Sequence, residues 1–169
     1  MRVFQPVDPE DIESGPYTFV GNKIIITSTD GDKVNLTAAK WGGIGYLWDK
    51  RLVFIFVRKN RYTRELLDAT GEFSVSFVDQ TEFRGALKYL SLVSGRDEDK
   101  VAGSRLNIGY YEGIPYVEEA GEVLVCRTAF RQEMEKEGFI DEALAEQFYK
   151  SEDDYHVLYA GELFKILLR

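Results

Sequence analysis

The chain has 169 residues, of which 44% are hydrophobic and 14% aromatic, so it can form a packed core without disulfide bonds or structural metal ions. Its formal net charge of −8 argues against a general nucleic-acid-binding protein, because such proteins gain much of their affinity by neutralising phosphates. The single cysteine, Cys126, excludes an intrachain disulfide and fits a reducing cytoplasm.

The N-terminal segment "MRVFQPVDPEDIESG" lacks the apolar stretch of a signal peptide, and no apolar run approaches the roughly 18 residues that span a bilayer. We therefore expect a cytoplasmic protein without a membrane span. The length predicts a single domain over residues 1–169, in which residues 1–14 form a surface arm.

The first half of the chain predicts β-structure with one short helix. Residues 17–39 carry two β-branched runs around an Asp-Gly hairpin signal, and "RLVFIFVR", residues 51–58, is apolar on both faces and therefore predicts a central strand. Residues 63–70 predict a helix that Thr63 caps and Gly71 closes. "EFSVSFV", residues 72–78, alternates apolar residues with serine and predicts a half-buried strand.

The second half mixes helices and strands. Residues 81–93 predict a helix capped by Thr81, and the polar turn "SGRDEDK", residues 94–100, contains Asp97 as the cap of a helix that begins near Glu98. Residues 113–135 predict two strands separated by "EEAG", residues 138–150 an acidic amphipathic helix, and residues 155–168 a strand bent at Gly161. Because regular βαβ alternation is missing, we expect a mainly β protein with short helices, closed into a small antiparallel barrel.

The stretch "VRKNRYTREL", residues 57–66, is unusual in an acidic protein, because six basic residues and no acidic one lie between Lys50 and Arg64. A strand, a basic loop and a helix start can hold an anion such as a phosphate monoester, since the first helical N–H groups and arginine side chains both favour it. A solvated loop is the alternative, and chemistry alone does not decide between the two.

Two further stretches have both a functional and a structural interpretation. In "VNLTAAKWGGIGYLW", residues 34–48, small residues would let a ligand approach the backbone, but composition alone favours a corner turn with Trp41 and Trp48 in the core. In residues 94–100, Ser94, Arg96 and Lys100 could contact a second anionic group or a partner subunit, but an internally paired turn is the favoured interpretation.

Residue types that carry catalysis are sparse. His156 is the only histidine, so it is either an acid–base group or a hydrogen-bonded structural residue. Cys126 lies in an apolar run and predicts a buried, inert thiol. No His and Cys cluster indicates a metal site, and no motif indicates a hydrolase triad, so the sequence identifies no catalytic residue.

Several motifs in fixed order resemble the flavin reductase-like family of FMN-binding split barrels, and its flavoredoxin-like branch in particular. They are the Asn-x-Thr-Ala turn at Asn35, the Trp41-Gly42 pair, the apolar strand, and Val-Arg-x-x-Arg-Tyr-Thr from Val57 to Thr63. "SGRDEDK" and "YHVLYAGEL" resemble later elements of that branch, so the resemblance runs from about Gly15 to Leu163.

The resemblance implies a six-stranded antiparallel Greek-key split barrel that forms a homodimer with FMN near the interface. It assigns the FMN phosphate to Arg58, Arg61, Tyr62 and Thr63, and it places His156 near the flavin. The residues that it implies for cofactor binding are Asn35, Thr37, Ala38, Ala39, Trp41, Gly42, Val57, Arg58, Arg61, Tyr62, Thr63, Ser94, Arg96 and Lys100.

The resulting hypothesis is an FMN-dependent oxidoreductase that uses NAD(P)H to reduce flavin, or to reduce a small acceptor through bound FMN. One alternative is a flavoredoxin-type electron carrier that exchanges electrons with a redox partner protein. Another is a barrel that binds a different phosphate ligand without catalysis. The bound cofactor would carry the redox chemistry, which fits the lack of a catalytic triad.

Overall fold

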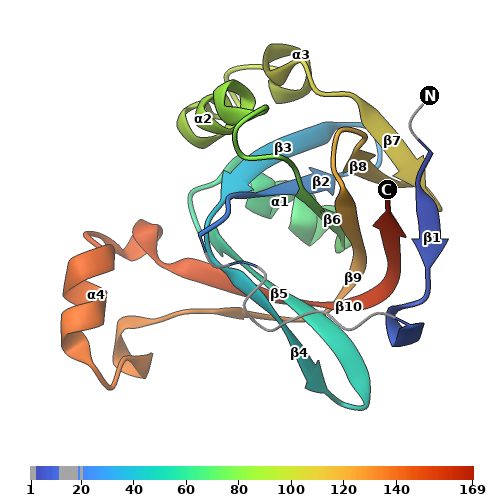
Figure 1. The fold of residues 1–169 in the computed structure, drawn as a ribbon. Coiled ribbons are helices and arrows are strands. Elements are labelled where there is room, and N and C mark those ends of the chain that lie inside the picture. Colours follow the sequence, from blue (N-terminus) through green and yellow to red (C-terminus); the bar gives the residue numbers. More distant parts are fainter. Residues whose placement is uncertain (1–2, 12–18, 20) are drawn as a thin grey trace.

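The fold is an antiparallel barrel-like sheet, seen in a computed structural model that describes residues 3–11, 19 and 21–169, the side chain of Glu10 excepted (Figure 1). The main sheet has eight strands in the order β3-β2-β6-β9-β10-β5-β4, with β1 paired to β10. Its strands are β1 (Gln5–Val7), β2 (Ile24–Thr29), β3 (Val34–Ala39), β4 (Gly42–Leu47), β5 (Lys50–Arg58), β6 (Glu72–Phe77), β9 (Glu122–Glu133) and β10 (His156–Leu168).

Short helices and a second hairpin surround this sheet (Figure 1). The hairpin is formed by β7 (Ile108–Tyr111) and β8 (Ile114–Val117). The helices are α1 (Tyr62–Thr70), α2 (Arg84–Leu92), α3 (Lys100–Ser104) and α4 (Glu142–Phe148), with 3-10 turns η1 (Pro9–Asp11), η2 (Lys136–Gly138) and η3 (Glu152–Asp154). In the described part of the chain, no helix is long and apolar enough to cross a bilayer.

The two end strands of the sheet, β3 and β4, are consecutive in the chain and are joined only by Lys40 and Trp41. They do not pair with each other in the described structure, so the barrel is split at this corner. The predicted class, a mainly β split barrel with short helices, is therefore confirmed.

The predicted number of strands was too small, because the eight strands of the described sheet include two that the sequence did not indicate. The first is β4, whose glycines are poor strand formers. They are tolerated because aromatic rings occupy the space of the missing side chains: a Cβ on Gly42 would lie 2.7 Å from the Phe19 ring, and one on Gly45 would lie 2.6 Å from the Phe54 ring.

The second is β1, in the segment expected to be a surface arm. Gln5 is paired with Leu168 and Val7 with Ile166, so the described residues 3–11 add a strand to β10. The rest of that expected arm, residues 1–2 and 12–14, lies outside the described residues, as do residues 17, 18 and 20 of the first predicted β-segment.

The core has two parts separated by β2, which is buried on both faces. Ile24 and Ile26 point into the barrel, where they join Val53 and Ile55 in one apolar cluster. Ile25 points the other way, into a cluster that includes Leu87 and Leu90 of α2. Full burial of such side chains stabilises the fold by roughly 1.5–3 kcal/mol each.

Strand β6 was expected to be half-buried, and this was wrong. Ser74 and Ser76 are as fully buried as Phe73 and Val75. The β7–β8 hairpin covers their face and satisfies both hydroxyls: Ser74 Oγ donates to the Pro115 carbonyl at 2.7 Å, and Ser76 Oγ accepts from the Val117 amide at 3.3 Å. Hydrogen bonding to a neighbouring backbone removes the cost of burying a polar side chain.

Three of the predicted helix caps were wrong, because other groups take their place. Thr63 lies inside α1, which begins after Arg61 without a side-chain cap. Thr81 precedes α2, and Asp79 accepts hydrogen bonds from the Thr81 and Glu82 amides there. Asp99 caps α3 in place of Asp97. The expected closure of α1 by Gly71 is confirmed, with φ of 72° and a hydrogen bond to the Leu67 carbonyl.

The segment between β9 and β10 forms an arm that extends away from the barrel and carries α4 (Figure 1). The Tyr149 and Tyr155 rings stack with centroids 4.6 Å apart, and Phe139 packs against both. These contacts hold the two ends of the arm together beside the start of β10. We call residues 134–155 the α4 arm.

The predicted bend at Gly161 is confirmed as a register shift between β10 and β9. A Cβ at Gly161 would lie 2.9 Å from the Cys126 Cβ and would overlap the Phe73 ring. Gly161→Ala should therefore lower the free energy of unfolding by about 1–3 kcal/mol in chemical denaturation.

Gly43→Ala is the matched control, because an added Cβ there meets no atom within 4 Å. Equal unfolding midpoints for the two variants would show that the close packing at Gly161 does not constrain the barrel.

Candidate functional site

A cavity of about 300 Å³ opens where the barrel is split. The ends of β3 and β5 and the start of β10 form it, and the pairing of His156 with Arg58 brings the last two together. Besides His156, it is lined by seven of the residues that the sequence assigned to FMN: Thr37, Ala38, Ala39, Trp41, Val57, Arg58 and Arg61. The two separate motifs therefore meet in space.

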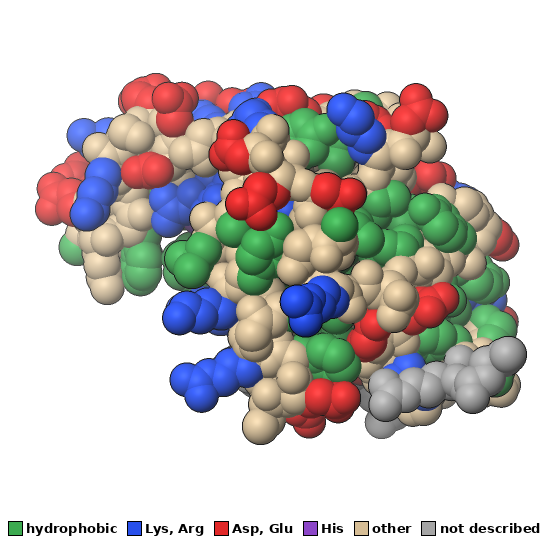
Figure 2. All heavy atoms as spheres, turned by 90° about the horizontal axis from the view of Figure 1, so that it is seen from above, with side chains coloured by type: hydrophobic (Ala, Val, Ile, Leu, Met, Phe, Trp, Pro, Cys, Tyr) green, Lys and Arg blue, Asp and Glu red, His purple; other side chains and the backbone are tan. Residues whose placement is uncertain are grey.

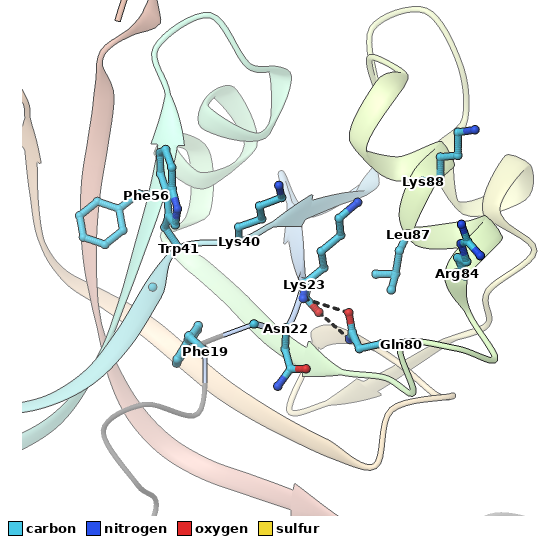
Figure 3. Close-up of a pocket in the computed structure, with 12 residues that line it drawn as sticks. Phe19, Asn22, Lys23, Lys40, Trp41, Phe56, Gln80, Arg84, Leu87 and Lys88 are labelled. Atoms are coloured by element: carbon cyan, nitrogen blue, oxygen red, sulfur yellow. Dashed lines mark hydrogen bonds between the residues drawn. The ribbon is translucent and has the colours of Figure 1, made fainter. Parts of the chain in front are cut away.

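A larger cavity of about 910 Å³ adjoins the first (Figure 3). Lys23, Lys40, Trp41 and Phe56 line both cavities, and the predicted residue Gly42 lines the larger one. We call them the split cavity, lined by His156 and Arg61, and the α2 cavity, lined by Leu87 and Arg84 of α2.

Of the other predicted residues, four lie around a third depression, Thr63 lies inside the protein, and Ser94 lines none of the three cavities. Asn35, Tyr62, Arg96 and Lys100 line a cavity of about 600 Å³ that neither His156 nor Trp41 reaches. Thr63 is buried, and its hydroxyl accepts a hydrogen bond of 3.1 Å from Asn35 Nδ2. This buried bond joins β3 to α1 and so fixes the basic loop beside the Thr37–Ala39 wall.

The "SGRDEDK" turn packs against the basic loop of its own chain. Arg96 donates a hydrogen bond of 2.8 Å to the Asn60 carbonyl, and it forms an ion pair with Glu65. Its guanidinium carbon lies 5.8 Å from the Tyr62 ring centroid. Ser94 accepts a hydrogen bond from the Arg96 amide at 3.2 Å. The turn is thus internally bonded and also supports the loop.

The positive charges near the loop are not equivalent. Lys50 pairs with Glu162 at 2.7 Å, Arg58 with Asp154 at 3.2 Å, and both Lys59 and Arg64 with Glu133. Arg61 makes no ion pair with any residue that the structure describes. Its side chain is exposed and lines the split cavity at the start of α1.

The start of α1 itself favours an anion. The helix has nine residues, its first residue is Tyr62, and no side chain caps its N-terminus. Unsatisfied N–H groups and the positive end of the helix dipole therefore lie beside the unpaired Arg61 guanidinium.

Lys100 adds a buried positive charge near Arg61. Only 4% of the residue is exposed, and its ammonium donates to the Leu90 carbonyl at 2.9 Å. Burial, together with the charge of Arg61, lowers the pKa of Lys100 to about 8. A buried ammonium near a second cation is costly unless an anion compensates it.

His156 is held neutral at the wall of the split cavity. Burial, and then the charge of Arg58, lowers the pKa of His156 to about 4. Its Nδ1 hydrogen-bonds with the Tyr149 hydroxyl at 2.8 Å, and the Trp41 ring centroid lies 5.4 Å from its own. His156 therefore connects the α4 arm to the split corner.

Composition had suggested that Trp41 and Trp48 lie in the core, and this was wrong. Trp41 is 44% exposed and Trp48 is 54% exposed. Trp41 packs edge-on against Phe148 of α4 and leaves much of its surface open at the two cavities. Cys126 is fully buried, as expected, and burial raises its pKa well above the usual range.

Sequence reasoning missed Lys23, Lys40, Phe56 and Ser91 as lining residues. The hairpin offered a signal for the two lysines, because the pairing of Ile24 with Ala39 places Lys23 and Lys40 just beyond the same end of β2 and β3. The described residues contain no group of three or more His, Cys, Asp or Glu side chains placed to hold a metal ion. The split cavity combines the positive charge of Arg61 with the flat apolar surface of Trp41, a combination that suits an anion and a planar group.

Known proteins share the fold of this chain. Residues 18–168 match the family described as "Flavin reductase like domain", so the chain belongs to that family. No curated protein sequence matches the chain significantly.

Three solved structures illustrate the shared fold. Flavoredoxin from Methanosarcina acetivorans has a TM-score of 0.69 at 21% identity, with 94% of this chain and 74% of that chain covered. The FMN-binding protein from Thermus thermophilus with bound p-hydroxybenzaldehyde has a TM-score of 0.68 at 20% identity, with 100% of this chain and 82% of that chain covered. The NADH:FAD oxidoreductase of Streptomyces globisporus C-1027 has a TM-score of 0.62 at 18% identity, with 86% of this chain and 74% of that chain covered.

The low pKa of His156 predicts a pH-dependent share of stability. The unfolded chain takes up this proton near pH 6.5 and the folded chain only near pH 4. The unfolded state therefore binds more protons between these values, and the free energy of unfolding falls by up to about 3 kcal/mol as the pH drops through them.

Denaturation of wild type and His156→Gln at pH 6.5 and pH 4 measures this share. The variant should lose less stability than wild type over the same interval, because all other titrating groups are common to both proteins. An identical decline in both would mean that His156 is not held neutral.

Proposed function

We propose that this protein binds FMN in the split cavity and acts as a flavin-dependent oxidoreductase. The observation that carries the proposal is the unpaired Arg61 at the uncapped start of α1, beside a wall of small residues. A dianionic phosphate would compensate this positive charge. Bound FMN would supply the hydride and electron transfer.

Each part of the cofactor has a suitable surface in this proposal. Arg61 and the first N–H groups of α1 would hold the phosphate, and the nearby charge of Lys100 would favour it. Ala38 and Ala39 leave room for the rest of the cofactor along β3, with Trp41 as a flat apolar neighbour. Arg58 would contribute less than Arg61, since Asp154 already pairs with it.

We further propose that NADH or NADPH donates the electrons. The split cavity opens into the larger α2 cavity, which leaves space for a second molecule beside a bound flavin. The neighbour from Streptomyces globisporus, described as an NADH:FAD oxidoreductase, supports this choice.

An electron carrier is the second candidate, because the structural neighbours include the flavoredoxin from Methanosarcina acetivorans. In that case a redox partner protein would dock near Trp41, which is exposed at the split corner.

The homodimer and the cytoplasmic location remain predictions. The α4 arm exposes apolar side chains that a second copy could cover: Ile140, which is 98% exposed, and Leu144 and Phe148 of α4. The single buried Cys126 fits a reducing compartment.

Arg61→Ala should raise the dissociation constant of FMN by about 10- to 150-fold, because a charge-assisted contact contributes about 1.5–3 kcal/mol. Riboflavin, which lacks the phosphate, should bind almost unchanged. Flavin fluorescence titration of the flavin-free protein measures both constants.

Lys136→Ala is a suitable control, since it removes an exposed positive charge from the α4 arm, outside the split cavity. Equal weakening of FMN and riboflavin by Arg61→Ala would contradict the phosphate assignment.

Anaerobic mixing of the FMN-loaded protein with NADH or NADPH should bleach the visible absorbance of oxidised flavin with one of the two donors. A stopped-flow spectrophotometer gives the rate, and free FMN with the same donors gives the background. A flavin that stays oxidised with both donors would reject the reductase and favour the carrier.

A further inference from the structure

The α4 arm reaches the split cavity through Tyr149, which directly follows helix α4. Seen from above, the arm lies beside the body of the molecule and carries charged side chains of both signs (Figure 2). The Tyr149 ring stacks on Tyr155 and packs against Phe139, and the guanidinium carbon of Arg58 lies 5.9 Å from its centroid. These contacts hold the Tyr149 hydroxyl 2.8 Å from Nδ1 of His156.

The Tyr149 hydroxyl has two acceptors nearby and one proton to donate. Nδ1 of His156 lies 2.8 Å from the hydroxyl oxygen, and the Met134 sulfur lies 3.9 Å from it. A thioether is a weak acceptor, whereas the unprotonated nitrogen of a neutral imidazole is a good one. Burial raises the pKa of Tyr149, so the hydroxyl keeps its proton. We therefore expect the hydroxyl to donate to Nδ1, which then carries no proton of its own.

The other ring nitrogen of His156, Nε2, must then carry the proton of the neutral imidazole. Nε2 makes no hydrogen bond with the described residues, and it is not among the fully buried polar atoms that lack a partner. It therefore keeps accessible surface, and His156 lines the split cavity. An N–H group without a partner in the described structure is thus available at the wall of that cavity.

This donor differs in charge from most other polar groups of the split cavity. Arg58 and Arg61 are cationic, Thr37 and Ser91 carry hydroxyls, and no described lining residue has a carboxylate or carboxamide side chain. Cationic side chains favour an anion, whereas a neutral N–H suits an uncharged acceptor such as a carbonyl oxygen or a ring nitrogen. The wall at His156 therefore suits the planar part of a ligand better than its phosphate.

We propose that Tyr149 is a positioning residue that holds His156 with Nε2–H toward the split cavity, where it donates to a carbonyl oxygen or ring nitrogen of the bound planar group. This inference rests on the proposed function, in which the planar group is the ring system of FMN. It gives the α4 arm a role in recognising the ring, separate from recognition of the phosphate by Arg61. The donor would be lost if the imidazole turned over or took the other tautomer, and the hydrogen bond from Tyr149 disfavours both.

Nitrogen NMR of the imidazole tests the tautomer directly, because His156 is the only histidine of the chain. In untagged, flavin-free protein with isotope-labelled histidine at pH 7, Nε2 should be protonated and Nδ1 unprotonated. Addition of riboflavin should shift the Nε2 resonance, because that N–H gains an acceptor. A proton on Nδ1 in the flavin-free protein would overturn the proposal.

Tyr149→Phe removes only the hydroxyl and should raise the dissociation constants of FMN and riboflavin by the same factor, about two- to tenfold. The factors should be equal because both flavins have the same ring, whereas Arg61→Ala should affect FMN alone. Tyr155→Phe is the matched control, since the Tyr155 hydroxyl makes no hydrogen bond with the described residues and its ring would keep the stack on Tyr149. Unchanged flavin binding by Tyr149→Phe would contradict the proposal.

A double-mutant cycle separates positioning from a general structural role. In a His156→Leu background, which has no ring nitrogen, Tyr149→Phe should not change either dissociation constant further. An equal effect in both backgrounds, or equal effects of Tyr149→Phe and Tyr155→Phe, would overturn the proposal. Protonation at Nε2 without binding of either flavin would reject the proposed function and leave the orientation of His156 by Tyr149 standing.

Discussion

Strands β3 and β4 follow one another in the chain with only Lys40 and Trp41 between them, yet each is an end of the sheet and they do not pair. A two-residue connection can close a hairpin, but here β3 pairs with β2 and β4 pairs with β5, so the barrel stays open at this corner. The split cavity and the α2 cavity both lie against Lys40 and Trp41. Without this opening, the motifs after β3 and after β5 would face no common space.

Strand β10 determines what surrounds that opening. Its first half pairs with β5 and its last residues with β1, while β9 runs along its other edge. The β5 pairing sets His156 opposite Arg58, and the preceding residues lead into the α4 arm. The closely packed Gly161 and the neutral His156 therefore lie on the same strand, which connects the core to the site.

The sequence predicted the larger elements and the basic loop, and it failed where tertiary contacts override local preference. "LVFIFV" and the two strands around "EEAG" were predictable because their apolar patterns are strong. Strand β4 was missed because its glycines pack under Phe19 and Phe54, which no local pattern reveals. The cap assignments failed because Thr63 bonds Asn35 and because Asp79 and Asp99 compete with nearby candidates. Lys23 was overlooked because only the folded hairpin brings it to the same end of β2 and β3 as Lys40.

In the proposed function, the positive charge at the start of α1 holds the phosphate of FMN. The most direct measurement is the visible spectrum of the protein after mixing with excess FMN and gel filtration. We expect oxidised flavin to elute with the protein. Inorganic phosphate at high concentration should lower the amount of flavin that elutes with it. A colourless protein peak, with all flavin eluting as the free compound, would contradict the account.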